Sequence, residues 1–205
     1  MVKYNGRYIF MCLPFFKGGV YMLFFGKKFV TERLIIREYK NKDLEGFLNV
    51  VRQPEIYAAT YGIPKDYTMY MAKYWFRMIK KNMHEGTAYE FAVTLKDSGK
   101  YIGNVGLINI TNEHNHADIS YYIDREYMNM GYATEAARKM IRYGFETYGY
   151  NKIAGVCMSC NPASRRVMEK IGMIYEGTLR QDLFKDGNYY DIDRLSILRS
   201  EYYRT

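Results

Sequence analysis

The sequence is short of the residues that mark several protein classes. It has only three cysteines in 205 residues, Cys12, Cys157 and Cys160. An odd, small number of cysteines argues against a disulfide framework and suits a reducing compartment, so we expect a cytoplasmic protein. Cys157 and Cys160 have C-x-x-C spacing, but no second Cys or His pair follows at a zinc-finger spacing. We therefore expect no metal site and no redox role.

Long uninterrupted apolar runs are also missing. The apolar stretch from residue 8 to residue 25 is broken by Pro14, Lys17, Gly18 and Gly19. Because a membrane-spanning helix needs about 20 mostly apolar residues, this stretch is a poor candidate and no membrane association is expected. We interpret residues 1–29 as an apolar N-terminal extension. Residues 30–205 are long enough to form one domain with its own core.

Charge is plentiful but not clustered. The formal net charge is +8, which favours anionic ligands. The Lys and Arg residues are scattered and form no basic tail, so no direct nucleic-acid binding is expected. The nucleotide fingerprints G-x-G-x-x-G and G-K-[S/T] are both absent. A phosphate-rich cofactor held in another way remains a candidate.

Hydrophobic periodicity predicts an α/β domain. Apolar and polar residues alternate in some segments and recur at helical spacing in others. Strands are predicted at residues 33–37, 89–95, 101–110, 118–124, 152–160, 173–180 and 189–198. Helices are predicted after residues 43 and 68, at 131–148, where Glu135 belongs to the outward face, and at 162–171. The order β-α-α-β-β-β-α-β-α-β-β predicts helices packed on a mixed sheet.

A glycine-containing segment, Tyr-Met-Asn-Met-Gly-Tyr-Ala-Thr-Glu-Ala at residues 127–136, joins a predicted strand to a long amphipathic helix. Free backbone N–H groups at the start of a helix form an anion site. Gly131 would let the backbone approach a phosphate closely. The alternative interpretation is an ordinary helix cap that contains a glycine.

A second junction is Asn161-Pro162-Ala163-Ser164, directly after a predicted strand. Asn161 is a good N-cap, and its amide could instead bond an extended ligand along the strand edge. Ser164 lies in the first turn of the helix, and Arg166 and Lys170 add positive charge nearby. These cations suit a phosphate, but they are equally explained as surface residues.

Taken together, three segments resemble the RimJ/RimL ribosomal-protein N-acetyltransferase branch of the GNAT superfamily. They are residues 31–37 (TERLIIR), residues 117–123 running into 130–136, and residues 161–164 running into 169–173; the tail from 176 to 191 is similar as well. The segments are specific because they occur in this order and spacing. The resemblance covers about residues 30 to 205. It implies a GNAT-like mixed, mostly antiparallel sheet with helices on both faces and a splayed central strand pair.

The resemblance also implies a reaction and a cofactor site. Acetyl-CoA would be the donor, and the acceptor would be an amine on a protein N-terminus or a small molecule, attacking directly. The pyrophosphate would rest on backbone amides of residues 129–134, and the pantetheine arm would run between the two splayed strands. The implied cofactor-binding residues are Ile123, Met128, Asn129, Met130, Gly131, Tyr132, Ala133, Thr134, Asn161, Ser164, Arg166 and Lys170. Met128 and Met173 depart from the usual residues of the family.

An amine must lose a proton before it attacks a thioester. For an alkylamine this costs roughly 4–5 kcal/mol at pH 7, and for a protein α-amine only about 1–1.4 kcal/mol. Glu90 is the first candidate base because it lies on the strand face opposite Phe91. Asp118 and Tyr122 are alternatives. We expect Ser164 to protonate or stabilise the thiolate, and a backbone N–H near Ile123 to meet the oxyanion.

Other functions remain open at this point. A non-catalytic acyl-CoA-binding sensor would keep the two junctions and lack a working base, and a nucleic-acid binder would use the net positive charge. Homodimerisation is left open. Acceptor choice is expected to depend on residues 53–66 and 177–188, where no motif decides it.

Overall fold

The computed structural model describes residues 2–4, 7–9 and 27–204, and its main body is an eight-stranded sheet. The strand order is β3-β4-β5-β6-β7-β8-β10-β9, antiparallel throughout except for the parallel pair β7 and β8. The strands are β3 (Lys28–Val30), β4 (Leu34–Arg37), β5 (Tyr89–Leu95), β6 (Tyr101–Thr111), β7 (His116–Ile123), β8 (Lys152–Met158), β9 (Ile174–Lys185) and β10 (Asn188–Leu198).

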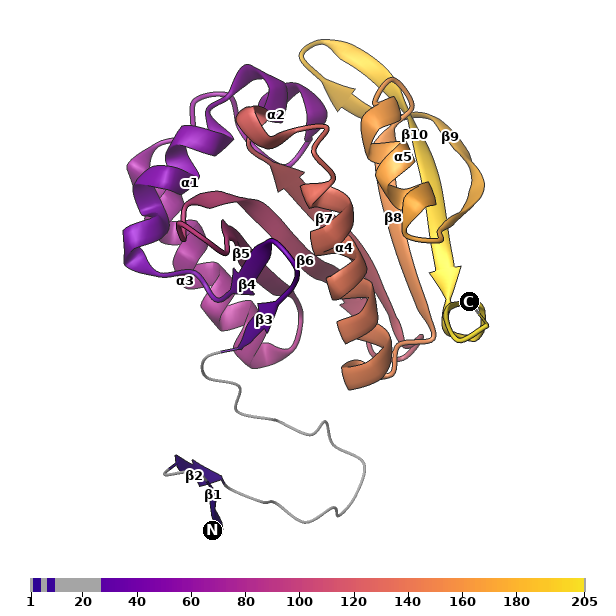
Figure 1. Cartoon of the computed structure of the whole chain (residues 1–205). Coiled ribbons are helices and arrows are strands. Elements are labelled where there is room, and N and C mark those ends of the chain that lie inside the picture. Colours follow the sequence, from indigo (N-terminus) through magenta and orange to yellow (C-terminus); the bar gives the residue numbers. More distant parts are fainter. Residues whose placement is uncertain (1, 5–6, 10–26, 205) are drawn as a thin grey trace.

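The parallel pair splits partway along its length. β7 and β8 are paired only from His116 and Lys152 to Asp118 and Ala154, although the strands continue to Ile123 and Met158. Beyond the last paired residues the strands diverge, which divides the sheet into two halves (Figure 1). The predicted mixed, mostly antiparallel sheet with a splayed central pair is therefore confirmed.

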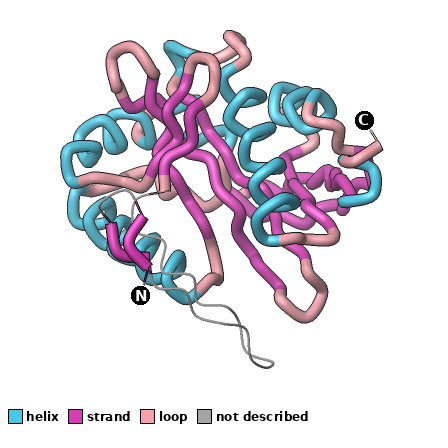
Figure 2. Tube along the Cα trace, turned by 60° about the horizontal axis from the view of Figure 1, so that its bottom comes forward, coloured by secondary structure: helices cyan, strands magenta, loops and turns pink. Residues whose placement is uncertain are grey.

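Helices cover both faces of this sheet, as Figure 2 shows. Phe91 of β5 packs in one core with α4, whereas the next residue, Ala92, packs in a second core with α1 and α3. The helices are α1 (Leu44–Val51), α2 (Pro54–Ala59), α3 (Met69–Glu85), α4 (Tyr132–Tyr143), α5 (Pro162–Lys170) and α6 (Arg199–Tyr202), with short turns η1 (Asn41–Asp43), η2 (Arg125–Tyr127) and η3 (Gly144–Tyr148).

The capping residues explain where two helices begin. Thr68 caps α3 through its side chain, which accepts a hydrogen bond from the backbone N–H of Met71 at 3.2 Å. Asn161 caps α5, because its Oδ1 accepts from the N–H of Ser164 at 3.1 Å, and Pro162 follows at the first helical position. The helix starts predicted at these two places are confirmed.

The structure corrects several predicted elements. The helix expected over residues 131–148 stops at Tyr143 and continues as the π-helical turn η3. The short elements β3, α2 and α6, each of six or fewer residues, were not predicted. Glu135 was placed on the outward face of its helix, and this was wrong, because its carboxylate binds Thr31 and Arg33.

The N-terminal extension lies largely outside the described residues, as does Cys12. Within the first 29 residues the structure describes β1 (Val2–Tyr4), which pairs with β2 (Arg7–Ile9), and the start of β3. β3 pairs with β4, so the main sheet already includes Lys28 and Phe29. None of the helices in the described residues has the length and apolar character needed to cross a membrane.

Candidate active site

Two pockets meet where the sheet splits. One, which we name the aromatic pocket, lies against the sheet beneath α1–α3, and the other, the loop pocket, lies between the start of α4 and the start of α5. Five residues line both pockets: Ala59, Thr60, Tyr121, Tyr122 and Ser164. A ligand in either pocket would therefore meet a ligand in the other at this shared wall.

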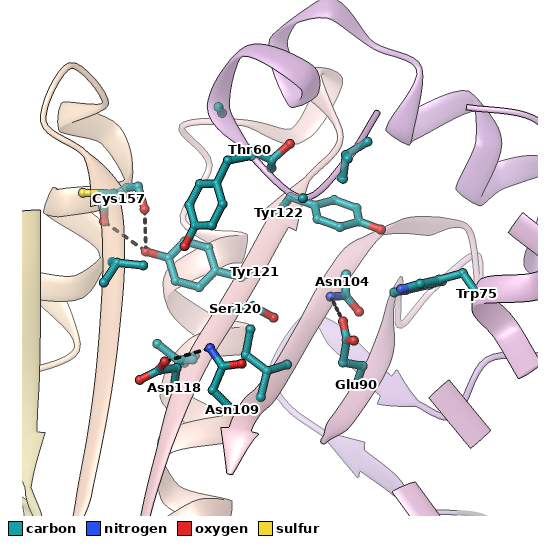
Figure 3. A pocket seen from close by; sticks show the side chains of 18 of the residues that line it. Thr60, Trp75, Glu90, Asn104, Asn109, Asp118, Ser120, Tyr121, Tyr122 and Cys157 are labelled. Atoms are coloured by element: carbon teal, nitrogen blue, oxygen red, sulfur yellow. Dashed lines mark hydrogen bonds between the residues drawn. The ribbon is translucent and has the colours of Figure 1, made fainter. Parts of the chain in front are cut away.

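Strand register gathers the polar groups of the aromatic pocket. Glu90 of β5 pairs with Gly106 of β6, which pairs with Ser120 of β7, so all three share one face. A Cβ on Gly106 would lie 2.8 Å from Cγ of Glu90, so a glycine is needed there. Glu90 and Asp118 are carboxylates that line this pocket (Figure 3). The described residues that line it include no Lys, Arg or His.

The Glu90 carboxylate is held by one amide. Nδ2 of Asn104 donates to Oε2 of Glu90 at 3.0 Å, and Oδ1 of Asn104 accepts from the hydroxyl of Tyr39 at 2.7 Å. Burial raises the pKa of Glu90, and the hydrogen bond from Asn104 opposes that rise. A carboxylate with a raised pKa is a better proton acceptor, which agrees with the role predicted for Glu90.

Tyr122 lies at the other end of the same polar group. Its hydroxyl is 3.1 Å from that of Tyr101, which is 3.5 Å from that of Tyr39. Burial raises the pKa of Tyr122 well above its ordinary value. The phenol therefore keeps its proton at neutral pH, and it is better suited to donating a hydrogen bond than to removing a proton.

Ser164 contacts a tyrosine that the sequence did not single out. The hydroxyl of Tyr121 donates to the backbone oxygen of Ser164 at 3.0 Å and lies 3.0 Å from its Oγ. Tyr121 and Tyr122 point to opposite faces of β7, yet both reach the pockets because the sheet is open at this point. The signal available in the sequence was the Tyr-Tyr pair at the end of a strand predicted to splay.

Asp118, the other alternative base, already has two partners. Its carboxylate accepts from Nδ2 of Asn109 at 3.0 Å and lies 3.1 Å from Nε2 of His116. Across the part of the chain that is described, no three His, Cys, Asp or Glu side chains gather as a metal site would require.

The loop pocket collects eleven of the twelve residues implied to bind the cofactor. They are Ile123, Met128, Asn129, Gly131, Tyr132, Ala133, Thr134, Asn161, Ser164, Arg166 and Lys170. Gly131 has φ +83°, a left-handed conformation that favours glycine, and it is the N-cap of α4. The free amides at the start of α4 thus lie in the pocket wall, with two cations of α5 opposite them.

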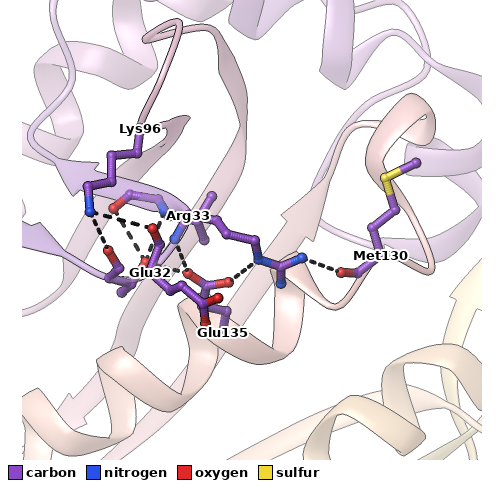
Figure 4. Close-up of polar contacts among 7 residues, drawn as sticks. Glu32, Arg33, Lys96, Met130 and Glu135 are labelled. Carbon is purple, nitrogen blue, oxygen red and sulfur yellow. Dashed lines mark hydrogen bonds and ion pairs between the residues drawn. The ribbon is translucent and has the colours of Figure 1, made fainter.

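Met130 is the exception, because it is exposed and does not line the pocket. Its backbone oxygen accepts from Nη1 of Arg33 at 2.8 Å, while Nε of Arg33 binds Oε2 of Glu135 at 2.7 Å (Figure 4). Thr31 donates to the other oxygen of Glu135 at 2.6 Å. Burial alone would raise the pKa of Glu135, but the hydrogen bonds from Thr31 and Arg33 outweigh this effect and hold the pKa below its usual value.

Comparison with known proteins agrees with this geometry. Residues 33–174 match the Acetyltransferase (GNAT) domain family. The N-acetyltransferase YnaD of Bacillus subtilis (strain 168) is 31% identical over 84% of this chain and 97% of its own length. Spermidine N(1)-acetyltransferase of Escherichia coli (strain K12) is 27% identical over 63% of this chain and 75% of its own.

Solved structures share the fold. The ribosomal-protein-S5-alanine acetyltransferase of Vibrio fischeri superposes with a TM-score of 0.75, at 21% identity, over 86% of this chain and 98% of its own. The chain belongs to the GNAT acetyltransferase family. It is an N-acetyltransferase that uses acetyl-CoA as its donor and an amine as its acceptor. The comparisons do not support the alternative of a non-catalytic acyl-CoA-binding protein.

Proposed function

We propose that acetyl-CoA occupies the loop pocket and that a small cationic amine occupies the aromatic pocket. The observation that carries this proposal is the wall that the two pockets share at Tyr121, Tyr122 and Ser164. It would bring the thioester and the amine together where β7 and β8 diverge. The amides at the start of α4 supply donors for the pyrophosphate, and Arg166 and Lys170 supply positive charge.

The acceptor is inferred from the chemistry of its pocket. Carboxylates without a cation among the described lining residues favour a positively charged ligand, and aromatic side chains such as Trp75 and Tyr61 favour it further through cation–π contact. The similarity to a spermidine acetyltransferase supports a small amine. A protein N-terminus, the acceptor class of the ribosomal-protein enzymes, is the competing outcome.

The proposed transfer assigns a role to each group. Glu90 accepts the proton of the ammonium group, and the neutral nitrogen attacks the thioester carbonyl. A backbone N–H near Ile123 stabilises the oxyanion. The C–N bond forms, and as the C–S bond breaks the attacking nitrogen loses its remaining extra proton to Oγ of Ser164, which passes its own proton to the departing thiolate. Tyr121 positions this Oγ.

Three broader expectations are also part of the proposal: a catalytic domain over residues 30–205, a cytoplasmic location and a homodimer. Cys157 and Cys160 are both free, which suits a reducing compartment. The edge strand β9 exposes Ile174, Leu179 and, near its end, Phe184, which suits contact with a second copy.

The test is thiol release from acetyl-CoA with three acceptor panels: polyamines, aminoglycosides and peptides with free N-termini. Turnover confined to the small amines is the expected result. Turnover confined to the peptides would overturn the acceptor assignment and keep the placement of acetyl-CoA. A Ser164→Ala variant is expected to lower kcat with little change in KM for acetyl-CoA, and an unchanged kcat would remove Ser164 from the mechanism.

A further inference from the structure

Helix α2 bridges the two halves of the split sheet. At its start, Nε2 of Gln53 donates to Oδ1 of Asp124 at 2.9 Å, and the backbone N–H of Arg125 donates to Oε1 of Gln53 at 2.9 Å. Nη1 of Arg125 also lies 3.1 Å from Oε1 of Glu55. Asp124 and Arg125 directly follow β7, so this end is fastened to the half of the sheet that ends in β7.

The other end of α2 is fastened to the opposite half. Nζ of Lys185 donates to the backbone oxygens of Tyr57 and of Thr60, the latter at 2.6 Å, and lies 4.1 Å from the centre of the Tyr57 ring. The hydroxyl of Tyr57 donates to Oδ1 of Asp186 at 2.6 Å. Lys185 and Asp186 lie at the turn between β9 and β10, which belong to the half of the sheet that begins with β8.

The bridge covers the point where the two pockets meet. Ala59 and Thr60, at its end, line both pockets, whereas neither Lys185 nor Asp186 lines either one. Only Ile56 of α2 is buried in the core, so the packing that holds this helix is slight. The contacts from the β9–β10 turn are therefore a large share of what keeps Ala59 and Thr60 in place.

We propose that Lys185 and Asp186 form a latch that holds α2 closed over the shared wall, and that they control ligand retention without touching either ligand. They are positioning residues that act through Ala59 and Thr60. The inference rests on the proposed placement of acetyl-CoA and acceptor in the two pockets. Opening the latch frees the end of α2 and uncovers the shared wall, so both ligands leave faster.

The experiment uses three side-chain changes in the full-length protein. Tyr57→Phe removes only the hydroxyl that binds Asp186, Asp186→Asn removes the charge, and Lys185→Met removes the ammonium group but keeps the apolar stem. The control is Lys81→Met, which breaks an exposed 3.8 Å pair with Glu85 on α3, away from both pockets. Melting temperatures establish that each variant is folded.

Two readouts are measured for each variant. The first is release of radiolabelled acetyl-CoA into excess unlabelled acetyl-CoA, followed by rapid filtration. The second is the pair of values kcat and KM for the acceptor. Since a single hydrogen bond contributes about 0.5–1.5 kcal/mol, we expect Tyr57→Phe and Lys185→Met to release acetyl-CoA roughly 3- to 10-fold faster and to raise KM by a similar factor. Asp186→Asn keeps an oxygen that can accept from Tyr57, so its effects should be smaller in the same direction. We expect kcat at saturation to stay within about twofold.

The double variant of Tyr57→Phe and Asp186→Asn is expected to be no worse than Tyr57→Phe alone, because Tyr57→Phe already removes the contact that Asp186→Asn only weakens. Release rates and KM values equal to those of Lys81→Met would overturn the latch. A fall in kcat with unchanged KM would overturn it too, because that pattern belongs to a group that acts in the chemical step. If the wild type acetylates none of the amines, the acceptor assignment fails separately, and the release rates still decide the latch.

Discussion

Replacing Glu90 by Gln tests the proposed base with the smallest change of shape. The amide keeps an oxygen that can accept from Asn104, which now lies 3.0 Å from the carboxylate, but it cannot take a proton. A positioned general base contributes about 10²- to 10⁴-fold. That range is comparable to the roughly 4–5 kcal/mol needed to deprotonate an alkylammonium group at pH 7. We therefore expect kcat/KM for a polyamine to fall by about two to four orders of magnitude.

The assay is thiol release across pH 5–9 with two acceptors, one alkylamine and one α-amine peptide. The loss should be smaller for the peptide, whose deprotonation costs only about 1–1.4 kcal/mol. In a plot of kcat/KM against pH, the wild type should also lose activity on the acidic side, at a pH set by the raised pKa of Glu90. The variant should lack this loss. The matched control is Glu126→Gln, an exposed carboxylate that lines neither pocket.

Stability should change in the opposite direction to activity. Because burial raises the pKa of Glu90, the stability it contributes is fully present below its ordinary pKa of 4.5 and is lost as pH rises through the raised value. At pH 7 the buried charge is therefore unfavourable, and Glu90→Gln should melt at the same temperature as the wild type or higher. Lower activity with a lower melting temperature would indicate a structural role, and unchanged activity would refute the base.

Three further outcomes follow from the structure. Gly131→Ala should destabilise the protein by about 1–2 kcal/mol, because φ is +83° there, and should raise KM for acetyl-CoA; unchanged values in denaturant titration and kinetics would contradict this. Glu135→Gln should be less stable at pH 7, because the lowered pKa of Glu135 makes its contribution fully present above the ordinary pKa of 4.5. The difference should shrink below pH 4.5 and be lost as pH falls through the lowered value, which melting curves from pH 3 to 7 check. At pH 8 a thiol reagent should modify the exposed Cys160 well before Cys157, whose pKa burial raises to about 11; mass spectrometry of the peptides would show equal labelling if this is wrong.

Much of the sheet could be predicted because each strand has a clear pattern of its own. The strands β5 and β6 were predicted at residues 89–95 and 101–110 from alternation, and α5 was predicted at 162–171, after the N-cap Asn161. The elements that escaped prediction depend on the rest of the fold. η3 continues α4 as a π-helical turn at Gly144, where a Cβ would lie 2.6 Å from Cδ1 of Ile153, and no local pattern reveals that contact.

The part of the candidate site that is built from backbone groups at strand-to-helix junctions could be predicted from the sequence. Gly131 and Asn161 could be singled out because each lies at a junction between a predicted strand and a predicted helix. The structure brings both to one pocket. Tyr121 was not singled out, because the Tyr-Tyr pair alone does not reveal its contact with Ser164 across the split between β7 and β8. Lys185 and Asp186 escaped for the same reason: their partners, Tyr57 and Thr60, are more than 120 residues away in the sequence.

Two of the segments that resemble the family, residues 31–37 and residues 130–136, are in direct contact in the structure. Thr31 and Arg33 lie between β3 and β4, yet their side chains converge on Glu135 in the first turn of α4. Arg33 also holds the backbone oxygen of Met130, one residue before Gly131. A loop that offers backbone amides to a pyrophosphate must hold them in place before the ligand arrives, because ordering them on binding would cost free energy. Arg33 holds the backbone on both sides of Gly131 from outside the pocket, through Met130 and Glu135. Met130 therefore helps to order the loop without lining the pocket.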